Sequence, residues 1–438
     1  MKTLILATAI GCCPLSSAHA QELFWGYSTG GIRQANADGS GTPTLFAPDC
    51  VHSTAVDPCT GDMYWSDQTT SCSGVIPTQG AIMRTEPGGN TTMLISNGAF
   101  ISRGVAVDPV ARRVYWTETL SGSTFSRICS VSMDGSGVTI DVSDSPTTPV
   151  TDPIGIQIDY VDGKMYWADF GGSLICHAQL DGSIPPGAVS TVLFDLTLAG
   201  ANPEAVVVDR TAGQIYWTNA AGGIGMGSLT GTGPTAFLPA GTIFTPGALA
   251  LDRQSRMLFF DSFVPGGGGS YEIRSHDLSN QQNATVHNGL SELNGGLAFD
   301  AGSLGTAYCA ANPNSSGAAA ELCVSGSTSV SANDLVLSAG PLDANQPGIF
   351  YYGPNQIQAV FGDGFRCVGG PGGTIVRIFP FALSDAGGTM VQLIDNSVPS
   401  AGSMTAGATL NFQCWFRDPA GAMSGFNLSD ARELTFAP

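Results

Sequence analysis

Three ionisable side chains in this sequence each stand five positions before one copy of a repeated aspartate. The aspartates follow short apolar stretches, and they are Asp57, Asp108, Asp159, Asp209, Asp252 and Asp300. Five residues before an aspartate stand His52, Arg103 and Glu204, and the other copies have Ile154, Gly247 and Gly295 there. An imidazole, a guanidinium and a carboxylate can move protons or hold a polar ligand if the fold brings them together. The repeat that carries these residues therefore decides whether they share one site.

The repeat contains an aromatic pair, which follows seven residues after each of the first five aspartates. The copies are Phe24-Trp25, Tyr64-Trp65, Tyr115-Trp116, Tyr166-Trp167, Tyr216-Trp217 and Phe259-Phe260. An isoleucine strand ending in a polar turn comes next, and then a short fourth strand such as Thr91–Ile95. The second aromatics recur every 40–51 residues, a spacing typical of propeller blades. Four antiparallel strands, repeated six times, predict a six-bladed β-propeller in an all-β chain.

The two ends of the repeat complement each other. Leu23–Trp25 is an aromatic strand without a first strand, and Gly296–Asp300 is a first strand without an aromatic partner. Together they would complete one blade and close the ring, which removes the exposed sheet edges of an open array. We expect the propeller to occupy residues 21–302.

The motifs resemble the YWTD family of six-bladed β-propellers, also called low-density lipoprotein receptor class B repeats. The resemblance covers residues 21–300 in all six units, with copies such as Tyr64-Trp65-Ser66-Asp67 and Tyr166-Trp167-Ala168-Asp169. It implies that Asp67 and Asp169, which keep the last position of the motif, tie neighbouring blades together.

In such a propeller the residues five before each aspartate begin the innermost strands, beside the central channel. His52, Arg103 and Glu204 would then share one channel mouth. The acids and amide that end the aromatic strands should lie on the same face, and they are Asp67, Glu118, Asp169 and Asn219. Phe125, Phe170 and Phe263 could add apolar contact area from loops. The alternative is that these are ordinary capping and solvent-exposed residues.

The most favoured function is binding of an extracellular protein or glycan, without enzymatic activity, cofactor or metal. A channel-centred, lactonase-like hydrolase is one alternative. Its divalent cation would need about six oxygen ligands, whereas the ring above offers one carboxylate and an opposing Arg103. No G-x-S-x-G nucleophile motif is present. The second alternative is a structural component of the cell envelope. The repeated aspartates are expected to cap tight turns.

Residues 303–438 lose the period and alternate short strands with glycine and proline turns, which predicts a small β-sandwich. Stretches such as Phe361-Gly362-Asp363-Gly364-Phe365-Arg366 and Phe416-Arg417-Asp418-Pro419 resemble a C-terminal segment common in secreted bacterial proteins.

Nine cysteines follow residue 20, an odd number that leaves at least one unpaired within the chain. We predict three disulfides, Cys50–Cys72, Cys309–Cys323 and Cys367–Cys414. Cys59 lies in a turn on the face opposite Cys50 and Cys72, so it is expected to be free. Cys129 and Cys176 are equivalent positions in adjacent blades, roughly 15 Å apart, and should not pair.

The first twenty residues read as a signal peptide. Lys2 precedes an apolar stretch, and Ala18-His19-Ala20 fits a cleavage site. The alternative is a lipoprotein signal ending at Cys12; either one directs the chain out of the cytoplasm. The formal net charge is −19, and it becomes −20 without this segment, which holds one lysine and no acid. Such a charge argues against nucleic-acid binding. No later apolar run is long enough for a membrane span, and the sequence predicts no oligomeric state.

Overall fold

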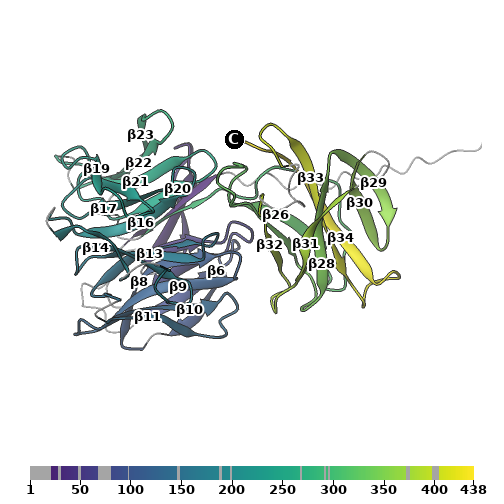
Figure 1. Cartoon of the computed structure of the whole chain (residues 1–438), viewed down its shortest axis with the longest axis horizontal. Helices are drawn as coiled ribbons and strands as arrows, with labels where there is room; N and C mark the ends of the chain where they lie inside the picture. The colour runs from purple at the N-terminus through teal and green to yellow at the C-terminus, as the bar shows by residue number, and fades with distance from the viewer. Residues whose placement is uncertain are drawn as a thin grey trace, which may run out of the picture.

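The structure is a computed structural model that describes residues 21–27, 31–47, 51–67, 80–96, 98–145, 148–186, 190–197, 200–266, 269–290, 293, 296–370, 375–396 and 404–438. No α-helix occurs within these ranges, and the chain folds into two all-β domains (Figure 1).

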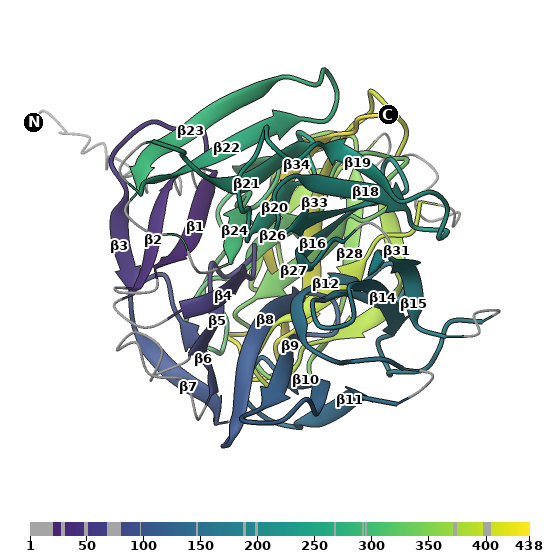
Figure 2. The ribbon, with the colours of Figure 1, turned by 90° about the vertical axis from the view of Figure 1, so that its left-hand side faces the viewer.

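Six four-stranded antiparallel sheets form the first domain, and Figure 2 shows them arranged around a central axis. The first blade joins β24 (Leu297–Asp300) to β1 (Glu22–Tyr27), β2 (Gly31–Asn36) and β3 (Thr44–Ala47). The second holds β4 (Val51–Val56), β5 (Met63–Asp67), β6 (Ala81–Thr85) and β7 (Thr91–Ser96). The third holds β8 (Phe100–Asp108), β9 (Arg113–Leu120), β10 (Ser126–Ser132) and β11 (Thr139–Ser143).

The remaining blades repeat this order. The fourth holds β12 (Pro153–Asp159), β13 (Lys164–Asp169), β14 (Leu174–Gln179) and β15 (Val192–Asp195). The fifth holds β16 (Pro203–Asp209), β17 (Gln214–Asn219), β18 (Ile224–Ser228) and β19 (Thr235–Leu238). The sixth holds β20 (Leu249–Asp252), β21 (Met257–Phe263), β22 (Tyr271–Asp277) and β23 (Asn283–Leu290). The pairing of β1 with β24, with Leu23 opposite Phe299, closes the ring as the sequence predicts.

The aromatic pairs hold adjacent blades together. Successive residues of a strand point to opposite faces of the sheet, so the two aromatics of each pair face different neighbours. Tyr166 packs in one apolar cluster with Trp217 of the next blade, and Trp167 packs in another with Tyr115 of the preceding blade. The same combination recurs at every blade interface, including Phe259 against Trp25 where the ring closes. Burying a side chain of this size contributes about 1.5–3 kcal/mol, so the motif is primarily architectural.

The third position of the motif supplies a polar tie between blades. The Ser66 hydroxyl donates to the Arg103 carbonyl of the next blade at 2.6 Å, and the Thr117 hydroxyl donates to the Ile154 carbonyl at 2.8 Å. Asp169, at the fourth position, accepts instead from the Thr151 backbone N–H at 2.7 Å, in the linker that joins the third blade to β12 of the fourth. Its carboxylate therefore caps the linker between two blades, and its expected role as a tie between blades stays a prediction.

Turns between first and second strands lie on one face of the propeller, which we call the turn face. The aspartates of the repeat cap backbone N–H groups there, as predicted; Asp108, for example, accepts from Val110 and Ala111 at 2.8 and 2.9 Å. Three of them also bind an arginine of the following blade. The resulting ion pairs are Asp57–Arg112 at 2.5 Å, Asp159–Arg210 at 2.6 Å and Asp209–Arg256 at 2.6 Å.

Two packed sheets and a hairpin form the second domain. The larger sheet has the order β25 (Thr306–Tyr308), β34 (Phe426–Thr435), β33 (Thr409–Arg417), β28 (Pro347–Gly353) and β31 (Val376–Leu383). The smaller sheet joins β26 (Glu321–Ser325), β27 (Val336–Gly340) and β32 (Met390–Leu393). The hairpin is β29 (Asn355–Phe361) with β30 (Gly364–Gly369). Leu322 and Leu337 of the smaller sheet share a buried core with Phe350 and Phe412 of the larger sheet, so the domain is a β-sandwich, as predicted.

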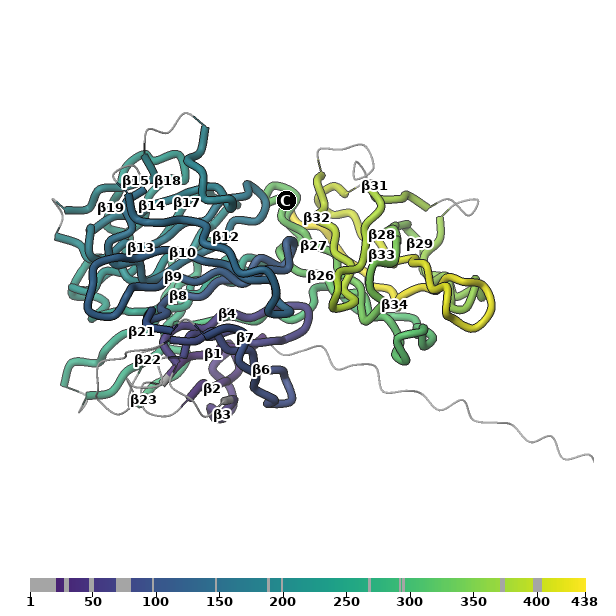
Figure 3. Tube along the Cα trace, turned by 90° about the horizontal axis from the view of Figure 1, so that it is seen from below, coloured from purple at the N-terminus to yellow at the C-terminus, as the bar shows by residue number. Residues whose placement is uncertain are grey.

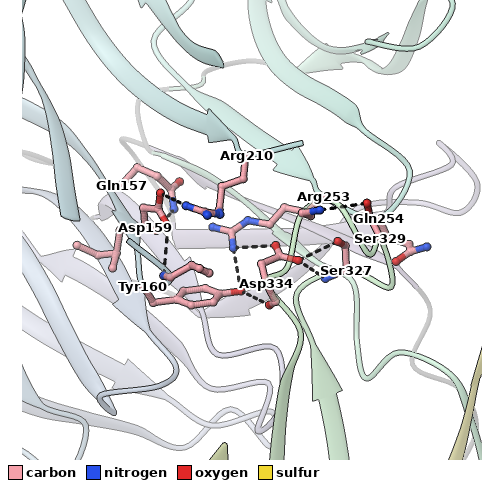
Figure 4. Close-up of polar contacts among 12 residues, drawn as sticks. Gln157, Asp159, Tyr160, Arg210, Arg253, Gln254, Ser327, Ser329 and Asp334 are labelled. Atoms are coloured by element: carbon pink, nitrogen blue, oxygen red, sulfur yellow. Dashed lines mark hydrogen bonds and ion pairs between the residues drawn. The ribbon is translucent and has the colours of Figure 1, made fainter. Parts of the chain in front are cut away.

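The sandwich lies against the turn face of the propeller (Figures 1 and 3). A disulfide joins Cys59 of the propeller to Cys323 of β26. The Tyr160 hydroxyl donates to the Asp334 carbonyl at 3.0 Å, and Arg253 lies 3.7 Å from the Asp334 carboxylate (Figure 4). Arg112 extends the contact to Asp385 at 3.4 Å.

Two of the predicted disulfides are wrong, as is the expectation of a free Cys59. Cys323 bonds to Cys59 instead of Cys309, because β26 faces the propeller turns. Cys309 bonds to Cys367 on the outer face of the larger sheet. Cys414 points into the opposite, inner face and is free, so a Cys367–Cys414 bond would have to cross the sheet.

The other cysteine predictions have different outcomes. Cys129 and Cys176 are both buried and free, which confirms that they do not pair. Cys50 and Cys72 lie outside the described residues.

Candidate functional site

The central channel of the propeller holds a cavity of about 690 Å³. The innermost strands of the blades form its wall, and the structure places His52, Arg103, Ile154, Glu204 and Gly247 around it. Gly295, the sixth position of the predicted ring, lies outside the described residues. Spacing from the repeated aspartate therefore located the residues that share the channel.

Glycines allow the innermost strands to come close to the axis. A Cβ atom on Gly104 would lie 2.1 Å from the Ile154 carbonyl oxygen, and one on Gly155 would lie 2.5 Å from that of Glu204. The backbone of the next blade therefore leaves no room for a side chain at Gly104 or Gly155. The glycines follow Arg103 and Ile154 directly, so they help to hold the ring residues at the channel.

Arg103 forms an ion pair in the channel with an acid that sequence reasoning missed. Its guanidinium lies 3.3 Å from Asp152, which precedes β12 in the linker and also lines the cavity. The buried Nε atom of Arg103 and Nδ1 atom of His52 have no hydrogen-bond partner among the described residues. Burial, reinforced by the Arg103 charge, lowers the pKa of His52 to about 4, so this imidazole is neutral at pH 7.

A second missed acid, Asp261, lies across the cavity from that pair. Its Oδ1 accepts from the backbone N–H groups of Gly247 and Ala248, both at 2.8 Å. Burial raises the pKa of Asp261 to about 7, against the effect of those two N–H groups, and the nearby Glu204 charge raises it further. Burial also raises the pKa of Glu204, while Arg103 acts in the opposite direction.

Two sequence signals could have revealed these acids. Asp261 occupies the third motif position, where the other copies have Gly26, Ser66, Thr117, Ala168 and Thr218. Asp261 is the only carboxylate among these six positions, and this difference in residue type is the signal that could have indicated a functional group. Asp152 stands two residues before the ring position Ile154, in a linker that the strand pattern did not include.

Acids and amide at the ends of the aromatic strands do not line the cavity in the described structure. Glu118 is completely buried, pairs with Arg127 at 2.5 Å and accepts from the Trp116 indole N–H at 2.6 Å. Asp169 caps the linker described above. Asp67 is 8% exposed, and the Asn219 backbone N–H donates to the Gly223 carbonyl at 3.1 Å. The alternative interpretation, a structural role, fits Glu118 and Asp169.

The three predicted loop aromatics fall in different places. Phe170 lines the cavity. Phe263 contacts the ring of Tyr271 with centroids 5.4 Å apart, and Tyr271 is itself part of the cavity wall. Phe125 is 42% exposed and packs on Phe100, away from the channel. Apolar contact area at the mouth therefore comes from Phe170 and Tyr271.

The sandwich domain covers the other end of the channel. Ser325, the last residue of β26, and Gly326 line the same cavity as Tyr160 and Arg253 of the turn face. Asp334 binds both Tyr160 and Arg253 from the sandwich side (Figure 4). A ligand would therefore enter from the opposite face, which carries the linkers between blades and which we call the linker face.

The described residues contain no group of three or more histidine, cysteine, aspartate or glutamate side chains placed to hold a metal ion. Among them there is also no helix with the length and apolar character needed to cross a membrane.

Comparisons with known proteins agree with the propeller architecture, although no family model matches the chain. The vitellogenin receptor of Solenopsis invicta is 30% identical over 128 residues, 29% of this chain and 6% of the receptor. Nidogen of Drosophila melanogaster is 26% identical over 218 residues, 50% of this chain and 15% of nidogen. The chain thus spans a small part of these relatives.

A solved structure supports the same fold. One chain in the crystal structure of a nidogen/laminin complex matches with a TM-score of 0.50 and 19% identity, covering 64% of this chain and 98% of that chain. Together with the motif repeat and the sheet order, these similarities define the first domain as a YWTD-type β-propeller.

Proposed function

We propose that this protein is a secreted, non-enzymatic binding protein that captures an extracellular protein or glycan at the mouth of its propeller channel. The observation that carries the proposal is the cavity itself, which is lined by His52, Arg103, Asp152, Glu204 and Asp261 and also by Ser325 and Gly326 of the sandwich at the turn-face end. Buried polar atoms without partners, such as Arg103 Nε and His52 Nδ1, are costly in an empty site, and a polar ligand would satisfy them.

The comparisons support an extracellular role. Vitellogenin receptor is the name of one relative, and the nidogen in the matched structure is in complex with laminin. The two disulfides, Cys59–Cys323 and Cys309–Cys367, suit an oxidising compartment. Secretion would follow from the signal peptide expected in residues 1–20.

Affinity capture from the native extracellular fluid tests this function. The tagged full-length protein should retain a partner that Arg103→Ala and Glu204→Ala lose by ~tenfold or more, since one polar contact in a buried site accounts for about 1.5–3 kcal/mol. Arg377→Ala, an exposed arginine on the sandwich, is the matched control and should capture normally. Unchanged circular dichroism would show that the variants are folded, and full capture by both channel variants would exclude the channel mouth.

A hydrolase centred on the same channel is the second candidate. It is favoured by the position of Asp261, which lines the cavity and is 4% exposed; this burial raises its pKa to about 7, which is suited to proton transfer near neutral pH. Turnover of simple esters, lactones or glycosides that Asp261→Asn abolishes would establish it. Absence of turnover across that panel would leave the binding function.

A further inference from the structure

We propose that Glu204 and Asp261 form a cation subsite that takes the primary ammonium or guanidinium group of a lysine or arginine on the captured partner. This inference rests on the proposed function and specifies the chemistry of the ligand. The sequence predicts that Arg103 in the ring opposes a bound cation, and the ion pair of Arg103 with Asp152 at 3.3 Å reduces that opposition.

Both carboxylates point to one place beside Gly247. A Cβ atom built on Gly247 would lie 3.3 Å from Glu204 Oε2 and 3.9 Å from Asp261 Oδ2. Glycine therefore leaves open a space with one carboxylate oxygen of each acid on its border. Both acids line the channel cavity, so the space is continuous with the mouth.

These oxygens are free to bind. Asp261 is 4% exposed, and its Oδ1 receives two backbone N–H groups while Oδ2 has no hydrogen-bond or ion-pair partner within the described chain. Neither oxygen of Glu204 has such a partner in the same set of residues. A carboxylate oxygen that lacks a donor at such a largely enclosed position gains a charge-assisted hydrogen bond when an N–H group of a cation binds.

Charge in the channel favours a cation over an anion. Arg103 is already paired with Asp152 at 3.3 Å. His52 is neutral at pH 7 because burial and the Arg103 charge lower its pKa. Glu204 and Asp261 therefore have no cation in contact with them among the described residues, although the Arg103 charge acts on Glu204 and lowers its pKa against the larger effect of burial.

An organic cation fits better than a metal ion. Ca²⁺ needs six to eight oxygen ligands, and one oxygen of Asp261 is already used by the backbone. An ammonium group needs only two or three acceptors. Ala205, Ala248 and Tyr271 also line the cavity, and apolar walls of this kind accommodate the aliphatic stem of lysine or arginine.

Isothermal titration of the full-length protein with n-butylammonium, 1-butanol and butyrate tests the subsite. The three probes share size and differ in charge. We expect n-butylammonium to bind at least ~tenfold more tightly than the other two, since a charge-assisted hydrogen bond is about twice as strong as a neutral one. Equal affinity for n-butylammonium and 1-butanol, or no binding of n-butylammonium, would overturn the inference.

Variants locate the binding of the probe. Glu204→Gln and Asp261→Asn should each weaken n-butylammonium binding by about tenfold, and asparagine keeps the oxygen that accepts from Gly247 and Ala248. Glu86→Gln, at an exposed turn between β6 and β7, is the matched control and should bind as the unmodified protein does. Unchanged binding in both channel variants would refute the subsite.

Dependence on pH gives a readout that needs no variant. The charged and titratable groups that share the channel with Asp261 are Glu204 from β16, Arg103 from β8 and Asp152 before β12, with neutral His52 from β4 and the Tyr271 phenol from β22. Tyr160, Asp252 and Arg253 line the same cavity from the turn face. Affinity for n-butylammonium should rise as the pH increases from about 5.5 to about 8, because Asp261 loses its proton in that range. An affinity that does not change, or falls, would contradict the role of Asp261.

Failure of the subsite and failure of the proposed function give different results. If n-butylammonium does not bind but Arg103→Ala still abolishes partner capture, the subsite is refuted and the channel-mouth function stands. If n-butylammonium binds as expected but Arg103→Ala captures normally, the subsite stands and the channel is not where the partner binds.

Discussion

At the scale of single residues, the third position of the aromatic motif has two roles. In the second and third blades a hydroxyl links strands at the channel; Thr117 accepts from the Gly104 N–H at 2.9 Å and donates to the Ile154 carbonyl of the next blade at 2.8 Å. In the sixth blade Asp261 replaces the hydroxyl and caps the start of β20 with one oxygen. The same position therefore serves architecture in some blades and supplies a candidate ligand group in another.

Replacing Thr117 with valine should test the architectural role. Thr117→Val keeps the size of a completely buried side chain but leaves a buried N–H and a buried carbonyl unpaired, which should lower the free energy of unfolding by about 1–3 kcal/mol. Urea denaturation measures this loss. Thr235→Val, at an exposed position of β19, is the control, and equal stability of the two variants would contradict the account.

Replacing Asp261 with asparagine should change how stability depends on pH. The pKa of Asp261 is about 7 in the folded protein and 3.8 as its ordinary value, so folding favours the protonated acid. The stability that this acid contributes is complete below pH 4 and is lost as the pH rises to about 7. The Asp261→Asn variant should therefore gain stability relative to the parent across that range, by an amount on the order of 4 kcal/mol. Parallel stability curves from denaturation at several pH values would argue against the buried, protonated acid.

At the scale of elements, three kinds of contact join each blade to its neighbours, and each kind lies at a different place in the propeller. Aromatic pairs fill the space between sheets, hydroxyls link the strands nearest the axis, and arginines bind the capping aspartates on the turn face. Among the ion pairs on the turn face, Asp159 has a side chain that is 1% exposed and pairs with Arg210 of the next blade. These three kinds of contact between neighbouring blades explain why an array of small sheets forms one rigid ring.

Removing one arginine tests the ion pairs that join blades on the turn face. Arg210→Gln leaves the buried Asp159 carboxylate without its guanidinium, and breaking a buried pair in this way costs about 3 kcal/mol. Thermal denaturation should show a lower midpoint for this variant. Arg377→Gln changes an exposed arginine of the sandwich and should leave the midpoint unchanged; a similar effect of both substitutions would speak against an ion pair that joins blades.

The sequence predicted the elements better than the site. The Tyr-Trp pairs recur at a constant separation from the preceding aspartates. This regularity predicted the number of blades, the closure of the ring and the shared channel of His52, Arg103 and Glu204. Asp152 and Asp261 were missed because a carboxylate's direction depends on linker geometry and on packing against the next blade. The pairing of Cys59 with Cys323 was missed because it depends on how two domains meet, which no local pattern records.

At the scale of the whole molecule, the sandwich is fixed across the turn face by a covalent bond and by polar contacts around Asp334. Cys59 and Cys323 are 264 residues apart in sequence, so their disulfide constrains a long segment of the unfolded chain. Ser325 and Gly326 line the channel from this side. The arrangement leaves the linker face as the accessible entrance.

Removing the interdomain disulfide should loosen the sandwich. Cys59→Ser with Cys323→Ser should lower stability by about 2–5 kcal/mol and increase protease cleavage between the domains. Cys309→Ser with Cys367→Ser removes a disulfide within the sandwich and is the matched control, which should affect the sandwich without exposing the region between the domains. Identical cleavage patterns for the two double variants would contradict the assigned pairing.

The most direct test of the central claim, that a partner binds at the channel mouth, is capture by a protein whose mouth is filled. Gly247→Leu places a side chain between Glu204 and Asp261, whereas Gly88→Leu adds the same side chain where the structure has open space. Quantitative capture of the partner should fall by ~tenfold or more for Gly247→Leu and stay unchanged for Gly88→Leu, with both proteins folded. Full capture by a folded Gly247→Leu protein would contradict the account.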